Sequence, residues 1–211
     1  MSFQNVHHFS SVGKREIQQD RVATDLQYLL VADGIGGLSN GDKAAEILVD
    51  TIVECFRAKT IKSLPKWIDK AIGLAHVKMQ IFSNENMGST FAMTMTYDES
   101  IYAIHLGDSK IVHFSKFGEL RWLSTDHTVN NSLTKAVMSS SDVVRPSIHK
   151  LDTEPNDYIL ICSDGVYEAC TTNQIGSWVN HYDNCEAIIS AIRNQCDKFS
   201  VDNNSAIVSK I

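Results

Sequence analysis

The apolar positions of this 211-residue chain repeat with two different periods. Several short runs are rich in apolar and β-branched residues, and residues 91–97 alternate with period two, which predicts strands whose successive side chains point to opposite faces. The predicted strands are 28–32, 91–97, 101–106, 110–114, 158–162 and 206–209.

Elsewhere, apolar residues return every three or four positions, which predicts helices with one buried face. The predicted helices cover 41–56, 65–82 and about 185–199, and the second begins at Pro65 because proline is favoured in the first turn. The residues expected on the buried faces are Ala45, Leu48, Ile52 and Cys55, then Ile68, Ile72, Ala75, Met79 and Phe82, then Ile188, Ile192 and Gln195 or Cys196.

The order of these elements indicates an α+β fold. Two long helices follow one another, a series of short strands comes next, and one helix precedes the last strand. A doubly wound parallel sheet would require strands and helices to alternate. We therefore predict mostly antiparallel sheets with helices packed outside. The chain length and the hydrophobic content of 43% suit one domain over residues 1–211.

The composition gives no sign of a nucleic-acid or membrane partner. The formal net charge is −6, and no apolar run approaches the ~20 residues that a membrane helix needs. The N-terminal residues lack the apolar core of a signal peptide. The five cysteines are odd in number and lack C-x-x-C spacing, which argues against a disulfide framework or a zinc ribbon. We expect a cytoplasmic monomer that binds neither nucleic acid nor membrane.

Five aspartates lie at or near the ends of predicted strands: Asp20, Asp33, Asp108, Asp164 and Asp202. Taken singly, an aspartate next to a glycine is typical of a turn. Five carboxylates at one edge of a pair of sheets would repel one another unless a cation held them. Carboxylate oxygens without histidine or cysteine suit hard cations such as Mg²⁺ or Mn²⁺.

Seven short motifs add a family resemblance that spans nearly the whole chain. In chain order they are Gly13-Lys-Arg-Glu-Ile-Gln-Gln-Asp20, Val31-Ala-Asp-Gly-Ile-Gly-Gly37, Gly88-Ser-Thr90, Gly107-Asp-Ser-Lys110, Thr125-Asp-His127, Ser163-Asp-Gly165 and Asp202-Asn203. Their order and spacing resemble those of the metal-dependent type 2C serine/threonine protein phosphatases, in particular the compact bacterial members.

This resemblance implies a four-layer αββα sandwich, with two mostly antiparallel sheets face to face and helices on the outer faces. It also implies a centre with two Mg²⁺ or Mn²⁺ ions. By matching position, Asp33 bridges both ions and Gly34 offers its carbonyl oxygen to one. Asp164 and Asp202 complete the coordination of the other ion, and Asp20 contributes through coordinated water.

Two further residues receive roles from the same resemblance. Arg15, which lies five residues before Asp20, matches the arginine that binds the substrate phosphate, and its fork can hold two phosphate oxygens. Asp108 resembles the residue that, with Asp164, holds a third, weaker ion in bacterial members. The catalytic residues implied are thus Arg15 and Asp33, and His127 is expected to have a structural hydrogen-bonding role.

The implied activity is hydrolysis of phosphoserine and phosphothreonine in proteins, whose phosphorylation a cognate kinase supplies. In this mechanism, a hydroxide bridging two ions ~3.5–4 Å apart attacks phosphorus directly. Many eukaryotic members carry a histidine after the first Asp-Gly as general acid, but Ile35 stands there and cannot transfer a proton. The alternative is a catalytically inactive phosphatase fold that serves as a binding module, which predicts the loss of one or more metal-binding aspartates.

Residues 128–150 depart most from the family pattern. Relatives carry a longer flap beside the active site, whereas this chain keeps only a short version around residues 133–137 and 139–141. We expect a more open site that leaves the choice of protein substrate to other surfaces.

Two other motif matches are weaker. Gly37-Leu-Ser-Asn-Gly41 fits a nucleophile elbow with Ser39 as nucleophile, but that motif needs its serine at the tip of a strand, and the predicted strand ends at Ala32. A phosphate-binding loop spanning Gly36 and Gly41 fails because Asp42 follows instead of lysine.

Overall fold

The computed structural model describes residues 2–58, 61–130 and 132–211. Its strands pair antiparallel in two large sheets and one short hairpin. The first sheet has the spatial order β1 (Gln4–Ser11), β13 (Asn204–Lys210), β12 (Tyr158–Cys162), β6 (Lys110–Phe114) and β7 (Leu120–Leu123). The second has the order β11 (Ser147–Lys150), β5 (Ser100–Leu106), β4 (Gly88–Tyr97), β3 (Tyr28–Gly34) and β2 (Asp20–Thr24), and β10 (Val137–Met138) also pairs with β4. The hairpin joins β8 (Thr128–Val129) to β9 (Ser132–Leu133).

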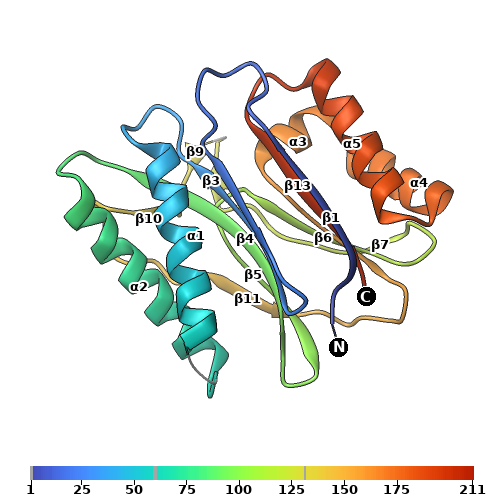
Figure 1. Cartoon of the computed structure of the whole chain (residues 1–211), viewed down its shortest axis with the longest axis horizontal. Coiled ribbons are helices and arrows are strands. Elements are labelled where there is room, and N and C mark those ends of the chain that lie inside the picture. The colour runs from blue at the N-terminus through green and yellow to red at the C-terminus, as the bar shows by residue number, and fades with distance from the viewer. Residues whose placement is uncertain (1, 59–60, 131) are drawn as a thin grey trace.

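Helices cover the outer face of each sheet (Figure 1). On the second sheet lie α1 (Gly41–Ala58) and α2 (Leu64–Phe82). On the first lie α3 (Asp164–Ala169), α4 (Thr172–Tyr182) and α5 (Cys185–Phe199). The predicted four-layer αββα sandwich is therefore confirmed.

Three hydrophobic cores hold the four layers together. In β3, Leu29 and Val31 point into the core between the sheets, whereas Leu30 and Ala32 point into the core beneath α1 and α2. A strand buried on both faces reads as one continuous apolar run, which is why this strand shows no alternation in the sequence.

The structure contains more elements than the apolar pattern predicts. The three predicted helices are α1, α2 and α5, but Phe82 is 52% exposed at the end of α2, so its expected place on the buried face is wrong. The shorter helices α3 and α4 were not predicted, and α4 begins with a reciprocal cap between Thr171 and Gln174. The predicted strands also miss β1, β2 and β7 to β11, most of which are short or lie at a sheet edge.

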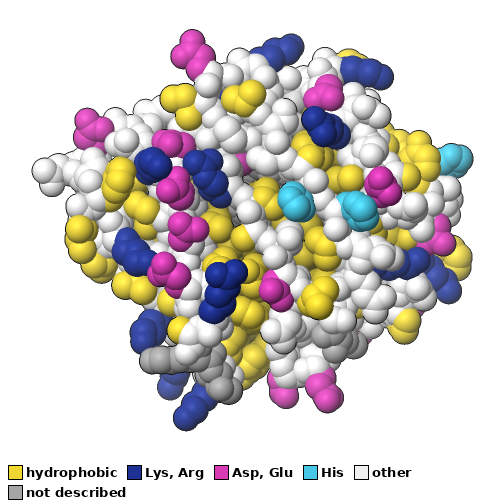
Figure 2. All heavy atoms as spheres, in the orientation of Figure 1, with side chains coloured by type: hydrophobic (Ala, Val, Ile, Leu, Met, Phe, Trp, Pro, Cys, Tyr) yellow, Lys and Arg dark blue, Asp and Glu magenta, His cyan; other side chains and the backbone are white. Residues whose placement is uncertain are grey.

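Several surface features bear on the expected partners. On the face shown in Figure 2, lysine and arginine side chains lie interspersed with aspartate and glutamate. None of the helices in the described part of the chain is long and apolar enough to cross a membrane. All five cysteines are free thiols, and all but Cys55 are buried.

Candidate metal centre

Two of the predicted acids lie opposite one another in the second sheet. Asp20 is the first residue of β2, and the antiparallel register pairs it with Asp33 of β3. Asp33 lies inside the strand, which continues to Gly34, and not directly after the strand as the sequence suggested. Like charges placed directly opposite in a sheet destabilise it, so this pair needs a proton or a cation.

The other acids come from loops and from a helix at the same end of the sandwich. Asp164 is the first residue of α3, and Asp108 lies between β5 and β6. Asp202 lies just before β13. Together with Asp33, these three residues line a cavity of about 160 Å³. Gly34 and Ile35 also line the cavity. The structure thus brings together acids that the sequence places far apart.

The electrostatics of this cavity favour a bound cation. Burial raises the pKa of Asp20 and of Asp164 to about 6, and repulsion from neighbouring carboxylates adds to both shifts. Burial also raises the pKa of Asp33 well above its ordinary range, and repulsion by Asp20, Asp164 and Asp108 adds to that shift. The pKa of Asp108 is raised as well, mainly by burial. Divalent cations would favour the charged forms of all four acids.

One oxygen atom of Asp20 is left without a hydrogen-bond donor. Its Oδ2 atom accepts a hydrogen bond from Ser163 Oγ at 2.8 Å. Its Oδ1 atom is buried and has no partner in the part of the chain that the structure describes. A proton on the facing Asp33 or a hydrated cation could satisfy this atom, so the donor set fits the metal that the sequence implies.

Among the described residues, no group of three or more His, Cys, Asp or Glu side chains is close enough to hold a metal ion. Arg15 binds the carboxylate of Asp202 with two hydrogen bonds. Arg15 Nε donates to Oδ1 at 2.7 Å and Nη2 donates to Oδ2 at 2.5 Å. The Arg15 side chain is 53% exposed. The sequence predicted that both residues lie at the site but gave no sign that they would pair.

Asn203 fixes the loop that carries Arg15. Its side-chain nitrogen donates to the carbonyl oxygens of Val12 and Ile17, and its side-chain oxygen accepts from Gln19 N at 2.9 Å. The Asp202-Asn203 motif pointed to this position, but sequence reasoning assigned Asn203 no role.

Serine and threonine side chains from the motifs link the strand ends. Ser163 Oγ donates to Asp20 and accepts a hydrogen bond from Ser205 N at 3.0 Å, which ties β2 to the first sheet. Thr90 Oγ1 and Ser109 Oγ are 2.8 Å apart, which ties β4 to the loop of Asp108. These hydroxyl groups connect the acids through polar contacts that a residue pattern alone does not reveal.

Two of the motif glycines are required by close backbone contacts. A Cβ atom on Gly34 would lie 2.1 Å from the carbonyl oxygen of Gly41, at the start of α1. A Cβ atom on Gly165 would lie 2.1 Å from the carbonyl oxygen of Asn203. Each glycine therefore lets a second segment approach the acid that precedes it in the chain.

The Thr125-Asp-His127 motif holds the loop that carries Asp108. His127 Nδ1 accepts a hydrogen bond from Gly107 N, and His127 N donates to Gly107 O, both at 3.0 Å. Since Nδ1 is the acceptor, Nε2 carries the proton and donates to Ser147 Oγ at 3.0 Å. Asp126 forms an ion pair with Lys110 at the other end of the loop. His127 thus has the hydrogen-bonding role that the sequence predicts.

Ser39 does not have the setting of a nucleophile elbow. It lies in the turn before α1, several residues after β3 ends at Gly34. In a nucleophile elbow the serine lies at the tip of a strand. The position of Ser39 therefore does not fit the nucleophile of such a hydrolase.

Comparison with known proteins identifies the family. The family model for Protein phosphatase 2C matches residues 10–204. The chain belongs to the protein phosphatase 2C family. It is 22% identical to Protein phosphatase PhpP of Streptococcus pneumoniae over 173 residues, which covers 70% of each protein. It is 25% identical to Serine/threonine phosphatase stp of Listeria monocytogenes over 166 residues, which covers 65% of this chain and 66% of that protein.

A solved structure shares the fold of this protein phosphatase 2C chain over its whole length. The catalytic domain of the serine threonine protein phosphatase PstP, in complex with 2 manganese ions, has a TM-score of 0.83 and is 18% identical; the match covers 100% of this chain and 99% of that one. The predicted family and the predicted class of enzyme, a protein phosphatase, are confirmed. Dependence on divalent metal ions is general to this family.

Proposed function

We propose that this chain hydrolyses phosphoserine and phosphothreonine in proteins and requires divalent metal ions for this reaction. The observation that carries the proposal is the convergence of Asp33, Asp108, Asp164 and Asp202 around one cavity, with Asp20 opposite Asp33. The match to the family model and the similarity to the Listeria serine/threonine phosphatase support the same activity.

In this proposal the acids hold Mg²⁺ or Mn²⁺. Asp33 and the carbonyl oxygen of Gly34 would hold the ions together with Asp164 and Asp202, and Asp20, opposite Asp33 in the sheet, would contribute through coordinated water. When bound, two ions would neutralise the phosphate and supply a bridging hydroxide for direct attack on phosphorus. Asp108, which lines the same cavity as Asp164, would help to hold a third ion.

Arg15 binds the phosphate of the substrate in this proposal. In this structure its guanidinium fork binds Asp202. Once Asp202 binds a cation, the same fork becomes free to hold two phosphate oxygens. The exposed position of Arg15 at the cavity edge supports this role because a protein substrate must reach the site from solvent.

Ile35 lines the cavity at the position where many eukaryotic members of the family carry a histidine. An aliphatic side chain has no ionisable proton to donate, so we propose that water protonates the departing serine or threonine oxygen. The substrates would be the targets of a cognate serine/threonine kinase, and we propose that the enzyme acts in the cytoplasm as a monomer, without nucleic acid or membrane.

The test is hydrolysis of phosphoserine and phosphothreonine peptides in Mn²⁺, with a phosphotyrosine peptide and an aryl phosphate for comparison. We expect phosphate release from the first two peptides that a chelator abolishes and that added Mn²⁺ restores. Peptide binding without phosphate release in Mg²⁺ or Mn²⁺ would instead favour the inactive binding module.

A further inference from the structure

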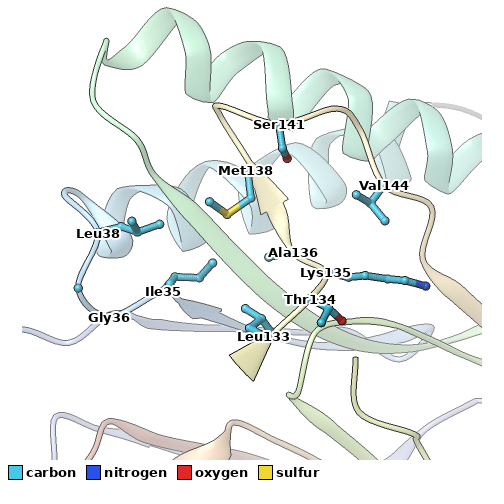
Figure 3. A pocket seen from close by; sticks show the side chains of 11 residues that line it. Ile35, Gly36, Leu38, Leu133, Thr134, Lys135, Ala136, Met138, Ser141 and Val144 are labelled. Atoms are coloured by element: carbon cyan, nitrogen blue, oxygen red, sulfur yellow. The ribbon is translucent and has the colours of Figure 1, made fainter. Parts of the chain in front are cut away.

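A second hollow, of about 490 Å³, opens beside the carboxylate cavity (Figure 3). We call it the flank groove. Its apolar side chains are Ile35, Leu38, Leu133, Ala136, Met138 and Val144. Ile35, Gly36 and Leu133 line both the flank groove and the carboxylate cavity, so the two hollows adjoin.

Two separate segments form the walls of the flank groove. Figure 3 shows Ile35 and Leu38, from the loop after β3, across from Met138 and Val144, which lie in the short flap between β9 and β11. A Cβ atom on Gly88 would lie 2.3 Å from Met138 Sδ and 3.1 Å from Ile35 Cδ1. Both side chains therefore pack against Gly88.

Hydrogen bonds hold both walls in place. On the first wall, Ile35 N donates to Gly88 O at 3.0 Å. On the flap wall, His76 Nδ1 donates to Met138 O at 2.7 Å, and Thr134 N donates to His127 O at 2.8 Å. Because the groove is preformed, a ligand would bind it without first ordering a loop.

Part of the apolar surface of the groove lies outside the hydrophobic cores. Leu38, Leu133 and Met138 are only half-buried, and they belong to none of the three hydrophobic cores formed by the described residues. A half-exposed apolar hollow next to a catalytic cavity is the usual setting of a ligand subsite.

We propose that the flank groove binds an apolar side chain of the phosphoprotein substrate, close in sequence to the phosphorylated residue. This inference rests on the proposed phosphatase function. An extended peptide rises about 3.3 Å per residue, so a side chain one to three residues from the phosphate can reach the adjoining groove. The lining offers aliphatic and thioether surface, beside the polar side chains of Thr134, Lys135 and Ser141, and its apolar part suits leucine, isoleucine, methionine or phenylalanine.

The short flap itself then takes part in the choice of substrate. The sequence suggested that a reduced flap leaves substrate choice to other surfaces. In the proposal, the retained flap residues form one wall of the surface that makes this choice, and the loop after β3 forms the other.

The first test uses the unaltered protein in Mn²⁺. A set of phosphothreonine peptides carries one leucine among glycines and serines, placed in turn at each of the three positions on either side of the phosphothreonine. We expect kcat/KM to rise about tenfold with leucine at one or two of these positions, since partial burial of an apolar side chain is worth that much discrimination. Equal kcat/KM for all positions of the leucine would overturn the proposal that the groove binds an apolar side chain.

The second test places a charge in the groove. We expect Leu38→Asp to remove the preference for leucine, so that kcat/KM no longer depends on the position of the leucine in the peptide. Val143→Asp is the matched control, because Val143 is 46% exposed in the flap and does not line the groove. This control should keep the full preference, and thermal melting checks that both variants are folded.

The outcomes separate this inference from the proposed function. If no peptide releases phosphate, the proposed function fails. If all peptides are hydrolysed at one rate, the function stands and the flank groove is overturned. The groove is also overturned if Leu38→Asp keeps the leucine preference, or if it converts a dimer into a monomer and thereby shows that a second copy covers the groove.

Discussion

At the scale of a single residue, Arg15 contacts the predicted metal ligand Asp202 and is also the proposed phosphate-binding residue. Its fork holds both oxygens of Asp202. A lysine would keep the charge but would lose the two parallel hydrogen bonds. The same fork geometry suits two oxygens of a phosphate group.

We therefore expect Arg15→Lys to lower kcat/KM for a phosphothreonine peptide by about 10- to 100-fold, mainly through KM. Initial rates over a range of peptide concentrations measure this effect. The neighbouring exposed residue provides the control, and Lys14→Arg should change kcat/KM by less than about twofold. An Arg15→Lys protein with unaltered KM would exclude the phosphate-binding role.

Residue patterns predict the acids of this site better than they predict its contacts. Asp33, Asp108, Asp164 and Asp202 were all expected, and the structure places them around one cavity. The contacts of Asn203, Ser163 and Thr90 were not expected, because each joins segments far apart in the chain and leaves no local signal.

At the scale of elements, the loop from Gly107 to Lys110 depends on a second loop for its shape. The His127 side chain makes hydrogen bonds to Gly107 N and Ser147 Oγ. Removing this side chain leaves the Gly107 N–H without its acceptor, which costs about 1–3 kcal/mol if that group stays buried.

We expect His127→Ala to lower the free energy of unfolding by about 1–3 kcal/mol in urea denaturation. Activity should fall as well, because Asp108 follows Gly107 directly. His8→Ala serves as the control, since His8 is exposed on β1 and far from this loop in the sequence. Equal unfolding free energies for His127→Ala and the unaltered protein would show that His127 does not support this loop.

The flap provides a second prediction at this scale. A longer flap grafted in place of residues 139–146 would cover more of the open site. We expect the graft to change turnover of phosphoproteins more than turnover of a small aryl phosphate, because only a protein substrate extends beyond the cavity. Equal effects on the two substrates would contradict the idea of a more open site.

Elements were predictable where the apolar pattern was long. The helices α1, α2 and α5 each carry a buried stripe over several turns, and the central strands β3 and β12 are mainly apolar. The helix α3 has only 6 residues and begins at Asp164, so its sequence reads as a turn. The edge strand β7 has 4 residues, none of them fully buried, which gives it too weak a pattern to detect.

For the whole molecule, the clustered acids link metal binding to pH. Burial and mutual repulsion raise the pKa of Asp20 and of Asp164 from 3.8 to about 6. In the ion-free protein these acids favour folding below pH 3.8, and this contribution is lost as the pH rises through about 6. Burial lowers the pKa of His105, His113 and His127. The contribution of these histidines to folding is therefore lost as the pH falls, which is the opposite of the trend for the acids.

The increase in Tm caused by Mn²⁺ isolates the acids, because the histidine contribution is common to both melts. We expect this increase to be larger at about pH 7.5 than at about pH 5.5, since below a pKa of about 6 the metal must displace protons. Differential scanning calorimetry with and without Mn²⁺ measures it. Equal increases at the two pH values would argue against metal binding by these carboxylates.

The most direct test of the metal-dependent mechanism is hydrolysis of a phosphothreonine peptide by the Asp33→Asn protein over a range of Mn²⁺ concentrations. Asp98→Asn is the matched control, because Asp98 is an exposed turn residue whose positive φ of 48° asparagine also tolerates. We expect Asp33→Asn to lose at least about a thousandfold in kcat at every Mn²⁺ concentration, while Asp98→Asn keeps full activity. An Asp33→Asn protein that hydrolyses the peptide at the unaltered rate would contradict the proposed metal centre.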